Sequence, residues 1–348
     1  TYYWNCQIQQ AIENAKKSLK IRESVGDIWK SGSTQTTLGH LYHQIGQWQL
    51  AERLLRQAIY VQSEIGDYYL LASSWSNLGL IMLDKGNIDE ALDCMNESVE
   101  IVVKQNLPIS LATPFFINRG IAYLRSGIHN RAQEDFLKGL NAAEEQSNND
   151  LQALGLGYLS ELSTDLGEES KAQVYLERAN VLVEHSKSQE VLREIFRIEA
   201  FLQSAIGNYC LALNSISQAQ DYAKKEGNQY EYAKLAIEKA RILLANDNVD
   251  VIIEQNLHTE IENSLKLFKD LGAKPGISWA EGILFEIESH KTSHKEYSTE
   301  LREYPTVVID IQFKSPSQRS LHEETNEKAV RLHHILAKEL KNIARKPN

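Results

Sequence analysis

Small and large apolar residues are interspersed with polar ones along this chain in a pattern that repeats about every 40 residues. In the first full repeat, Gly39 and Tyr42 belong to one apolar stripe with helical spacing, and Ala51 and Leu55 belong to a second. Gly46 lies between the two stripes. Because residues three or four positions apart lie on the same face of a helix, each repeat predicts two amphipathic helices joined by a short turn.

The same kinds of residue return at the same positions in four further repeats. A small residue marks the first helix, an alanine marks the second, and a larger apolar residue follows that alanine by four positions. The marker residues of the later repeats are Gly79, Ala91 and Met95; Gly120, Ala132 and Phe136; Ser160, Ala172 and Leu176; and Ala200, Ala212 and Ile216. We expect the small residues to let the two helices approach closely, and the larger residue to fill the space one turn further on.

Helix-ending residues separate the predicted helices. A glycine lies between the two helices of each repeat, and a second set of residues, mostly glycine, lies between one repeat and the next. The first set is Gly46, Gly86, Gly127, Gly167 and Gly207, and the second is Gly26, Gly66, Asn106, Ser147, Lys187, Gly227 and Gly272. Each repeat is therefore predicted to be a helix-turn-helix hairpin.

This spacing resembles the tetratricopeptide repeat family, whose pattern is met here by Trp75, Leu78 and Gly79 and by Ala132 and Phe136. The family repeats about every 34 residues. The longer repeat found here is similar to that of arrays in large bacterial signalling ATPases and regulators, and in kinesin light chains. The resemblance implies an all-α fold, a right-handed superhelical solenoid of hairpins, whose concave groove binds a protein or a peptide segment.

Both ends of the predicted solenoid, which covers residues 1–288, depart from the pattern. Residues 1–25 match only a second helix, so the first hairpin is predicted to be incomplete and the chain to be part of a longer protein. Residues 289–318 are predicted to be a linker or extended segment, with strand-like alternation at 307–313. Residues 319–348 are predicted to form a C-terminal amphipathic helix, and we expect this tail to dock on the array.

The first helix of each hairpin is expected to line the inner wall of the solenoid, so its spacing predicts the residues of the groove. The candidate partner-binding residues are His40, His43, Asn77, Leu80, Leu83, Ile117, Asn118, Ile121, Leu124, Arg125, Arg197, Phe201 and Arg241. The two asparagines carry amides, which can donate to and accept from a peptide backbone. A mostly apolar central groove with scattered arginines suits a segment with apolar anchors and some acid, although each apolar residue has the alternative role of packing hairpins together.

Acidic residues are concentrated in the predicted solenoid. The formal net charge of the chain is −10, and residues 1–288 carry 13 more acidic than basic side chains. An acidic surface repels phosphate, so the main surface is not expected to bind nucleic acid. No apolar run approaches the roughly 18 residues needed to cross a bilayer, and three widely spaced cysteines form neither a disulfide framework nor a zinc motif. We expect a folded cytoplasmic protein without a membrane partner.

No motif for catalysis is present in the sequence. Three histidine pairs have the spacing to share a metal, namely His40 with His43, His290 with His294, and His333 with His334. No nearby carboxylate or cysteine completes a set of four ligands. Phosphate-binding glycine loops and the Gly-x-Ser-x-Gly motif are also absent. We therefore predict no metal, no cofactor, no catalytic residue and no enzymatic activity.

Three functional hypotheses follow from these observations. The first is a protein-binding or peptide-binding module that serves as the sensor or scaffold segment of a larger regulatory protein, such as a bacterial signalling ATPase with a nucleotide-hydrolysing switch or a regulator. The second is a receptor for a short peptide that enters the curve of the solenoid and closes it, as in quorum-sensing regulators built on similar repeats. The third and remote one is a metal-dependent enzyme that uses the histidines.

Overall fold

The computed structural model describes residues 2–246 and 251–300, and every regular element in these ranges is helical. Contacts divide the chain into two units, Thr1–Ser293 and His294–Asn348, and all the hairpins belong to the first. The elements are α1 (Tyr2–Ser24), α2 (Ile28–Gln44), α3 (Trp48–Ile65), α4 (Tyr68–Lys85), α5 (Ile88–Lys104), the 3-10 helix η1 (Ile109–Ala112), α6 (Thr113–Arg125), α7 (His129–Glu145), α8 (Asn149–Asp165), α9 (Glu169–Val183), α10 (Gln189–Ala205), α11 (Tyr209–Glu226), α12 (Gln229–Ala245), α13 (Val251–Leu271) and α14 (Lys274–Glu300).

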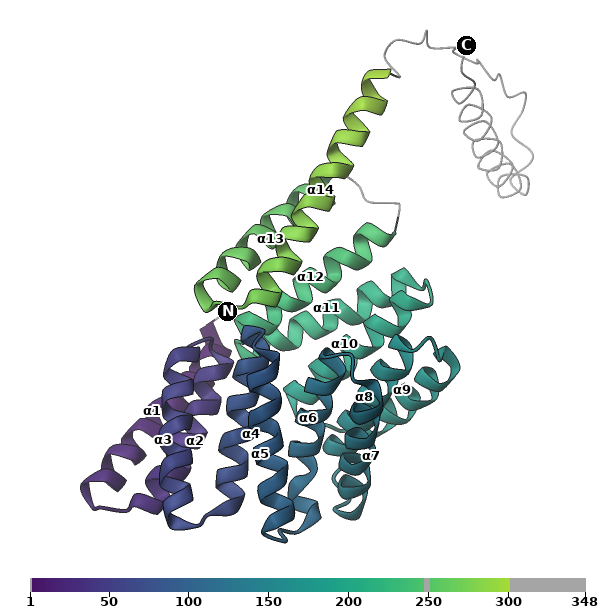
Figure 1. Ribbon diagram of the computed structural model, residues 1–348. Helices are drawn as coiled ribbons and strands as arrows, with labels where there is room; N and C mark the ends of the chain where they lie inside the picture. Colours follow the sequence, from purple (N-terminus) through teal and green to yellow (C-terminus); the bar gives the residue numbers. More distant parts are fainter. Residues whose placement is uncertain (1, 247–250, 301–348) are drawn as a thin grey trace. The chain divides into compact units, whose positions relative to one another are not determined.

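The helices of the first unit pair in sequence into six hairpins, from α2 with α3 to α12 with α13 (Figure 1). Helix α1 packs on α2. The predicted all-α solenoid of helical hairpins is confirmed. The strand and the amphipathic helix predicted within residues 301–348 lie outside the described residues, and the predicted domain boundaries remain predictions.

The small residues of the first helices allow the close contact on which each hairpin depends. A Cβ atom added at Gly39 would lie 2.6 Å from Cγ of Leu55, and one added at Gly120 would lie 2.5 Å from Cε1 of Phe136. Gly79 has the same relation to Met95, with 2.8 Å to Cγ. These distances are too short for any side chain, so the spacing of small and large residues that marks the sequence also sets how the helices pack.

The helices end at the predicted helix-ending residues, with one exception. Every glycine predicted to end a helix has a φ between +71° and +80°, and Asn106 and Ser147 adopt the same left-handed conformation with φ of 49° and 52°. Lys187 is the exception, because no positive φ is found there. The chain instead enters α10 through Ser188, whose hydroxyl accepts a hydrogen bond from the backbone N–H of Val191.

The last hairpin returns to the first two, so that the array closes on itself (Figure 1). One continuous core contains buried residues of α2, α3 and α4 together with residues of α12, α13 and α14. At its centre the ring of Tyr230 lies edge-on to Trp48, with centroids 4.8 Å apart, and edge-on to Phe268 at 5.8 Å. The Tyr230 hydroxyl also donates to the carbonyl oxygen of Asp84, 146 residues away in sequence, at 3.4 Å.

Two turns of the early hairpins complete this closure. The Pro275 ring at the start of α14 lies against the turn at Gly86, and Leu271 at the end of α13 lies against the turn at Gly46. Lys274 donates to the side-chain oxygen of Asn87 at 3.2 Å.

None of the helices in the described ranges is both long enough and apolar enough to span a bilayer.

Candidate ligand-binding cavity

The closed array surrounds a cavity of about 620 Å³. Its wall is formed by the first helices of all six hairpins, α2, α4, α6, α8, α10 and α12, and by the start of α14. Leu80, Leu83, Ile117 and Ile121 form an apolar wall on α4 and α6. The opposite wall on α8, α10 and α12 is rich in charged side chains. The groove predicted to be mostly apolar is therefore lined by many charged side chains as well as by apolar ones.

Eleven of the thirteen predicted groove residues line this single cavity. They are His40, His43, Leu80, Leu83, Ile117, Asn118, Ile121, Arg125, Arg197, Phe201 and Arg241. Leu124 instead packs in the hydrophobic core with α7 and α8, because it lies one position before Arg125 and so faces a different side of α6. Asn77 is half-buried and does not line the cavity. The Asn118 amide donates to the Ser76 hydroxyl at 2.9 Å, a bond inside the array.

A buried ion-pair network crosses the charged wall. Glu161 on α8 accepts hydrogen bonds from Arg125 on α6, at 2.8 Å, and from Arg197 on α10. Arg197 also donates to Glu194 at 2.8 Å, and the Tyr158 hydroxyl donates to the same carboxylate oxygen at 2.9 Å. The side chains of Glu161 and Arg197 are 3% and 5% exposed, so neither charge has water as an alternative partner. The network therefore ties together three consecutive hairpins.

The pairing perturbs the acidity of both carboxylates. Burial acts to raise the pKa of Glu194, but the charge and hydrogen bond of Arg197 and the charge of Arg193 outweigh it and lower the pKa to about 2. Burial likewise acts to raise the pKa of Glu161, and the charges of Arg125 and Arg197 lower it. Both carboxylates are therefore ionised at neutral pH and neutralise the two arginines.

The two predicted histidines lie at another part of the wall. Nε2 of His43 lies 2.8 Å from a carboxylate oxygen of Asp84, and Nε2 of His40 lies 3.1 Å from the amide nitrogen of Gln44. Burial lowers the pKa of His40, which keeps its ring neutral at pH 7. Within residues 2–246 and 251–300, no group of three or more histidine, cysteine or acidic side chains is placed to hold a metal ion.

Sequence reasoning missed much of the charged wall. Glu190, Arg193 and Glu194 on α10, Lys234 and Glu238 on α12, and Trp279 on α14 all line the cavity. A signal for the α10 residues was present, because Glu190, Arg193, Glu194, Arg197 and Phe201 follow one another at helical spacing along one face. Trp279 could not be found in this way, since it reaches the cavity only through the return of α14.

Comparison with known proteins gives the repeat a name. Residues 30–102 match the family model described as tetratricopeptide repeat. Residues 30–102 therefore contain tetratricopeptide repeats. A comparison with curated protein sequences gave no match.

Solved structures similar to this array of helical hairpins include BtubC from P. vanneervenii, which is 19% identical, with a TM-score of 0.50 over 62% of this chain and 91% of BtubC. The apo form of RapI is 16% identical, with a TM-score of 0.53 over 73% of this chain and 94% of RapI. A Rap protein complexed with competence and sporulation factor is 10% identical, with a TM-score of 0.50 over 84% of this chain and 89% of that protein. At these identities the likeness is one of fold.

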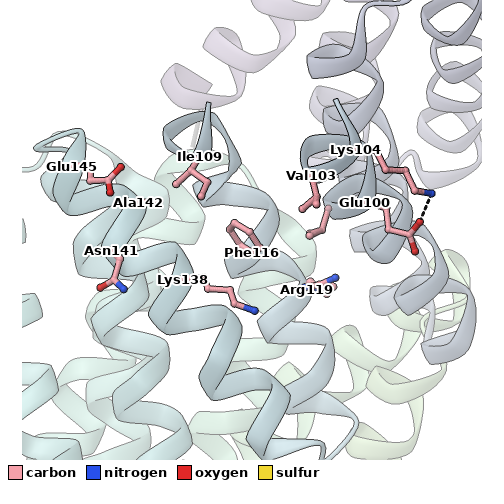
Figure 2. A pocket seen from close by; sticks show the side chains of 11 residues that line it. Glu100, Val103, Lys104, Ile109, Phe116, Arg119, Lys138, Asn141, Ala142 and Glu145 are labelled. Atoms are coloured by element: carbon pink, nitrogen blue, oxygen red, sulfur yellow. Dashed lines mark hydrogen bonds and ion pairs between the residues drawn. The ribbon is translucent and has the colours of Figure 1, made fainter. Parts of the chain in front are cut away.

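A second hollow lies outside the ring of first helices. It is formed by α5, η1, α6 and α7 of the tetratricopeptide array, and none of the predicted groove residues lines it. Figure 2 shows Ile109, Val103 and Phe116 around this hollow and the ion pair between Lys104 and Glu100 at its edge. Arg119 is held by Asp135 at 2.7 Å. Among the described residues of the hollow only Lys104 and Glu100 pair with each other, and the hollow is lined by fewer charged and polar side chains than the interior cavity.

Proposed function

We propose that the tetratricopeptide array binds a short peptide in the cavity enclosed by its first helices. The observation that carries this proposal is the return of α13 and α14 to the first two hairpins, which adds the start of α14 to the inner wall and makes that wall a cavity. Its volume of about 620 Å³ falls in the range of about 300–1,000 Å³ that is common for pockets of small ligands. A long helix or a folded domain would need an open groove instead.

The chemistry of the wall supports a peptide ligand. The apolar side chains on α4 and α6 offer contacts for aliphatic or aromatic groups, while α8, α10 and α12 offer charged and polar groups for backbone and side chains. A Rap protein of similar fold has been crystallised with competence and sporulation factor, which supports ligand binding by arrays of this kind. The role of sensor or scaffold in a larger regulatory protein remains a prediction from the sequence.

Binding can be tested by selecting ligands from a displayed library of random heptapeptides on the folded 348-residue chain. Selected peptides are then synthesised and titrated by calorimetry against Leu80→Ala and Phe201→Ala. Both side chains line the cavity and are half-buried. The control is Val181→Ala, because Val181 is 73% exposed on α9 and does not line the cavity.

Loss of either apolar contact is expected to weaken binding by about tenfold or more, since burial of such a side chain is worth about 1.5–3 kcal/mol. The control variant is expected to bind as the unchanged protein does. The proposal fails if the folded chain retains no peptide. It also fails if the cavity variants bind every selected peptide with unchanged affinity.

A further inference from the structure

The cations of the cavity wall are almost all neutralised by the protein itself. Arg125 and Arg197 are held by Glu161 and Glu194, as described above. Lys234 lies 2.9 Å from the Glu231 carboxylate, and Arg193 pairs with Glu226. Arg241 is the one lysine or arginine of the described wall that has no carboxylate partner, and its guanidinium lies over the Trp279 ring at 5.7 Å.

The acids of the wall are not neutralised to the same extent. The described lining contains seven carboxylates against five lysine and arginine side chains. Asp165, Glu190 and Glu238 form no hydrogen bond or ion pair within the described part of the chain. Glu238 is the most enclosed of the three, being half-buried, whereas Asp165 and Glu190 are exposed. An empty cavity lets water solvate these groups, but a ligand that fills it removes that water.

We infer that the ligand of this cavity carries a positive charge, such as a lysine, an arginine or a free amino terminus, which pairs with Glu238. This inference rests on the proposed function and specifies the chemistry of its ligand. A carboxylate that loses water without gaining a partner opposes binding, and a cationic group on the ligand removes that cost. Asp165 and Glu190 add to the negative potential at the edge of the same cavity.

The surroundings of Glu238 leave its charge uncompensated. Burial raises the pKa of Glu238, and the nearby charges of Arg197, Lys234 and Arg125 do not offset this effect. Burial also raises the pKa of Asp165, and the like charge of Glu161 one turn earlier on α8 acts in the same direction. Both carboxyls therefore have affinity for a further positive charge.

The sequence alone favoured the opposite ligand, a segment carrying acid, because Arg125, Arg197 and Arg241 were expected on the wall. An acidic group of the ligand could form an ion pair with Arg197 only by displacing Glu161. The Glu161 side chain is 3% exposed and would be left as an unpaired buried charge. Breaking a buried pair in this way is strongly unfavourable. Arg241 alone is available to an acid, and it is outnumbered by the three unpaired carboxylates.

The first test uses the peptides selected on the unchanged protein and needs no protein variant. Each basic residue of a selected peptide is replaced in turn by glutamine and by glutamate, and the free amino terminus is acetylated. We expect one of these neutralisations to weaken binding by about tenfold or more, and the glutamate replacement to weaken it further, as for loss of a charge-assisted hydrogen bond. Binding should also weaken as the pH falls towards the pKa of Glu238, because the protonated carboxyl no longer attracts the cation.

Glu238→Gln is expected to remove the difference between the basic peptide and its neutral counterpart. Glu64→Gln serves as the control, because Glu64 is exposed on α3 and does not line the cavity. The inference is overturned if neutral or acidic peptides bind as tightly as basic ones, or if Glu238→Gln keeps the full preference. In those cases peptide binding itself stands, whereas absence of any bound peptide removes the proposed function and this inference together.

Discussion

The Pro275 ring meets the turn at Gly86 where the array closes, and a matched pair of substitutions isolates that contact. Gly86 and Gly207 each follow a first helix, and each has a φ of +80°. A Cβ atom at Gly86 would lie 2.7 Å from Cδ and 2.9 Å from Cγ of Pro275, whereas one at Gly207 would meet no heavy atom within 4 Å. Gly86→Ala therefore adds steric overlap to backbone strain, and Gly207→Ala adds backbone strain alone.

The two contributions have different magnitudes. Placing alanine in the left-handed region costs about 1–2 kcal/mol, and this term is common to both variants. The overlap at Gly86 is with a proline ring, which cannot rotate out of the way, so we expect a further cost of about 1–3 kcal/mol, as for other overpacked sites. If α14 shifts to relieve the overlap, the contacts of Tyr230 with Trp48 and Phe268 are loosened, and closure is weakened.

Urea unfolding followed by circular dichroism measures the free energy of unfolding of both variants, and small-angle scattering measures whether the native array expands. We expect Gly86→Ala to be the less stable variant by about 1–3 kcal/mol and to be the only one with a larger radius of gyration. Adding Pro275→Ala should recover part of the loss in Gly86→Ala and none in Gly207→Ala. Equal destabilisation and equal dimensions of the two variants would refute the idea that this contact holds the array closed.

Three further predictions concern the ion-pair network and the helix ends. Arg197→Ala leaves the buried carboxylates of Glu161 and Glu194 short of a partner and should lower the free energy of unfolding by about 3–5 kcal/mol, measured in urea at pH 7; a loss below 1 kcal/mol would contradict the network. The pKa of Glu194 is depressed from its ordinary value of 4.5 to about 2, so its contribution, on the order of 3 kcal/mol, is fully present above pH 4.5 and is lost as the pH falls towards 2. Acid titration of stability should therefore be shallower in Glu194→Gln than in the unchanged chain. Ser147 has a φ of 52°, so Ser147→Gly should raise the thermal midpoint, with a gain of up to about 1 kcal/mol, and a lower midpoint would show that the turn needs the serine side chain.

The hairpins could be predicted from the sequence because their packing is local. Gly39 contacts Leu55 only 16 positions away, and the turn between the two helices carries its own glycine. Pairs across neighbouring hairpins were also within reach, because Arg125 and Glu161, and Glu161 and Arg197, are each 36 residues apart. This separation is one helical turn less than the repeat of about 40 residues, so the repeat length places the two charges near each other on successive first helices.

Closure of the array and the resulting cavity could not be predicted from the same information. The contact of Tyr230 with Trp48 depends on the total rotation that accumulates from one hairpin to the next along the array. No local sequence pattern indicates the size of that total rotation. Closure also explains why the cavity is less apolar than the predicted groove, because α12 and α14 bring Glu238 and Trp279 to its wall from a distant part of the chain.

Closure and ligand binding share residues, and this sharing links their energetics. Trp279 lies on the cavity wall, and Pro275 on the same helix both lines the cavity and contacts the turn at Gly86. A ligand that touches α4 and α14 at once makes all of its contacts only when the array is closed, so it stabilises the closed arrangement by the difference between its affinities for the closed and open states. By the same linkage, any change that opens the array lowers the affinity in proportion to the closed fraction it removes. We therefore expect Gly86→Ala to lower ligand affinity through the closed fraction, although Gly86 does not line the cavity. The basic group proposed for the ligand would add its attraction for Glu238 to the contacts that hold α12 and α14 in place.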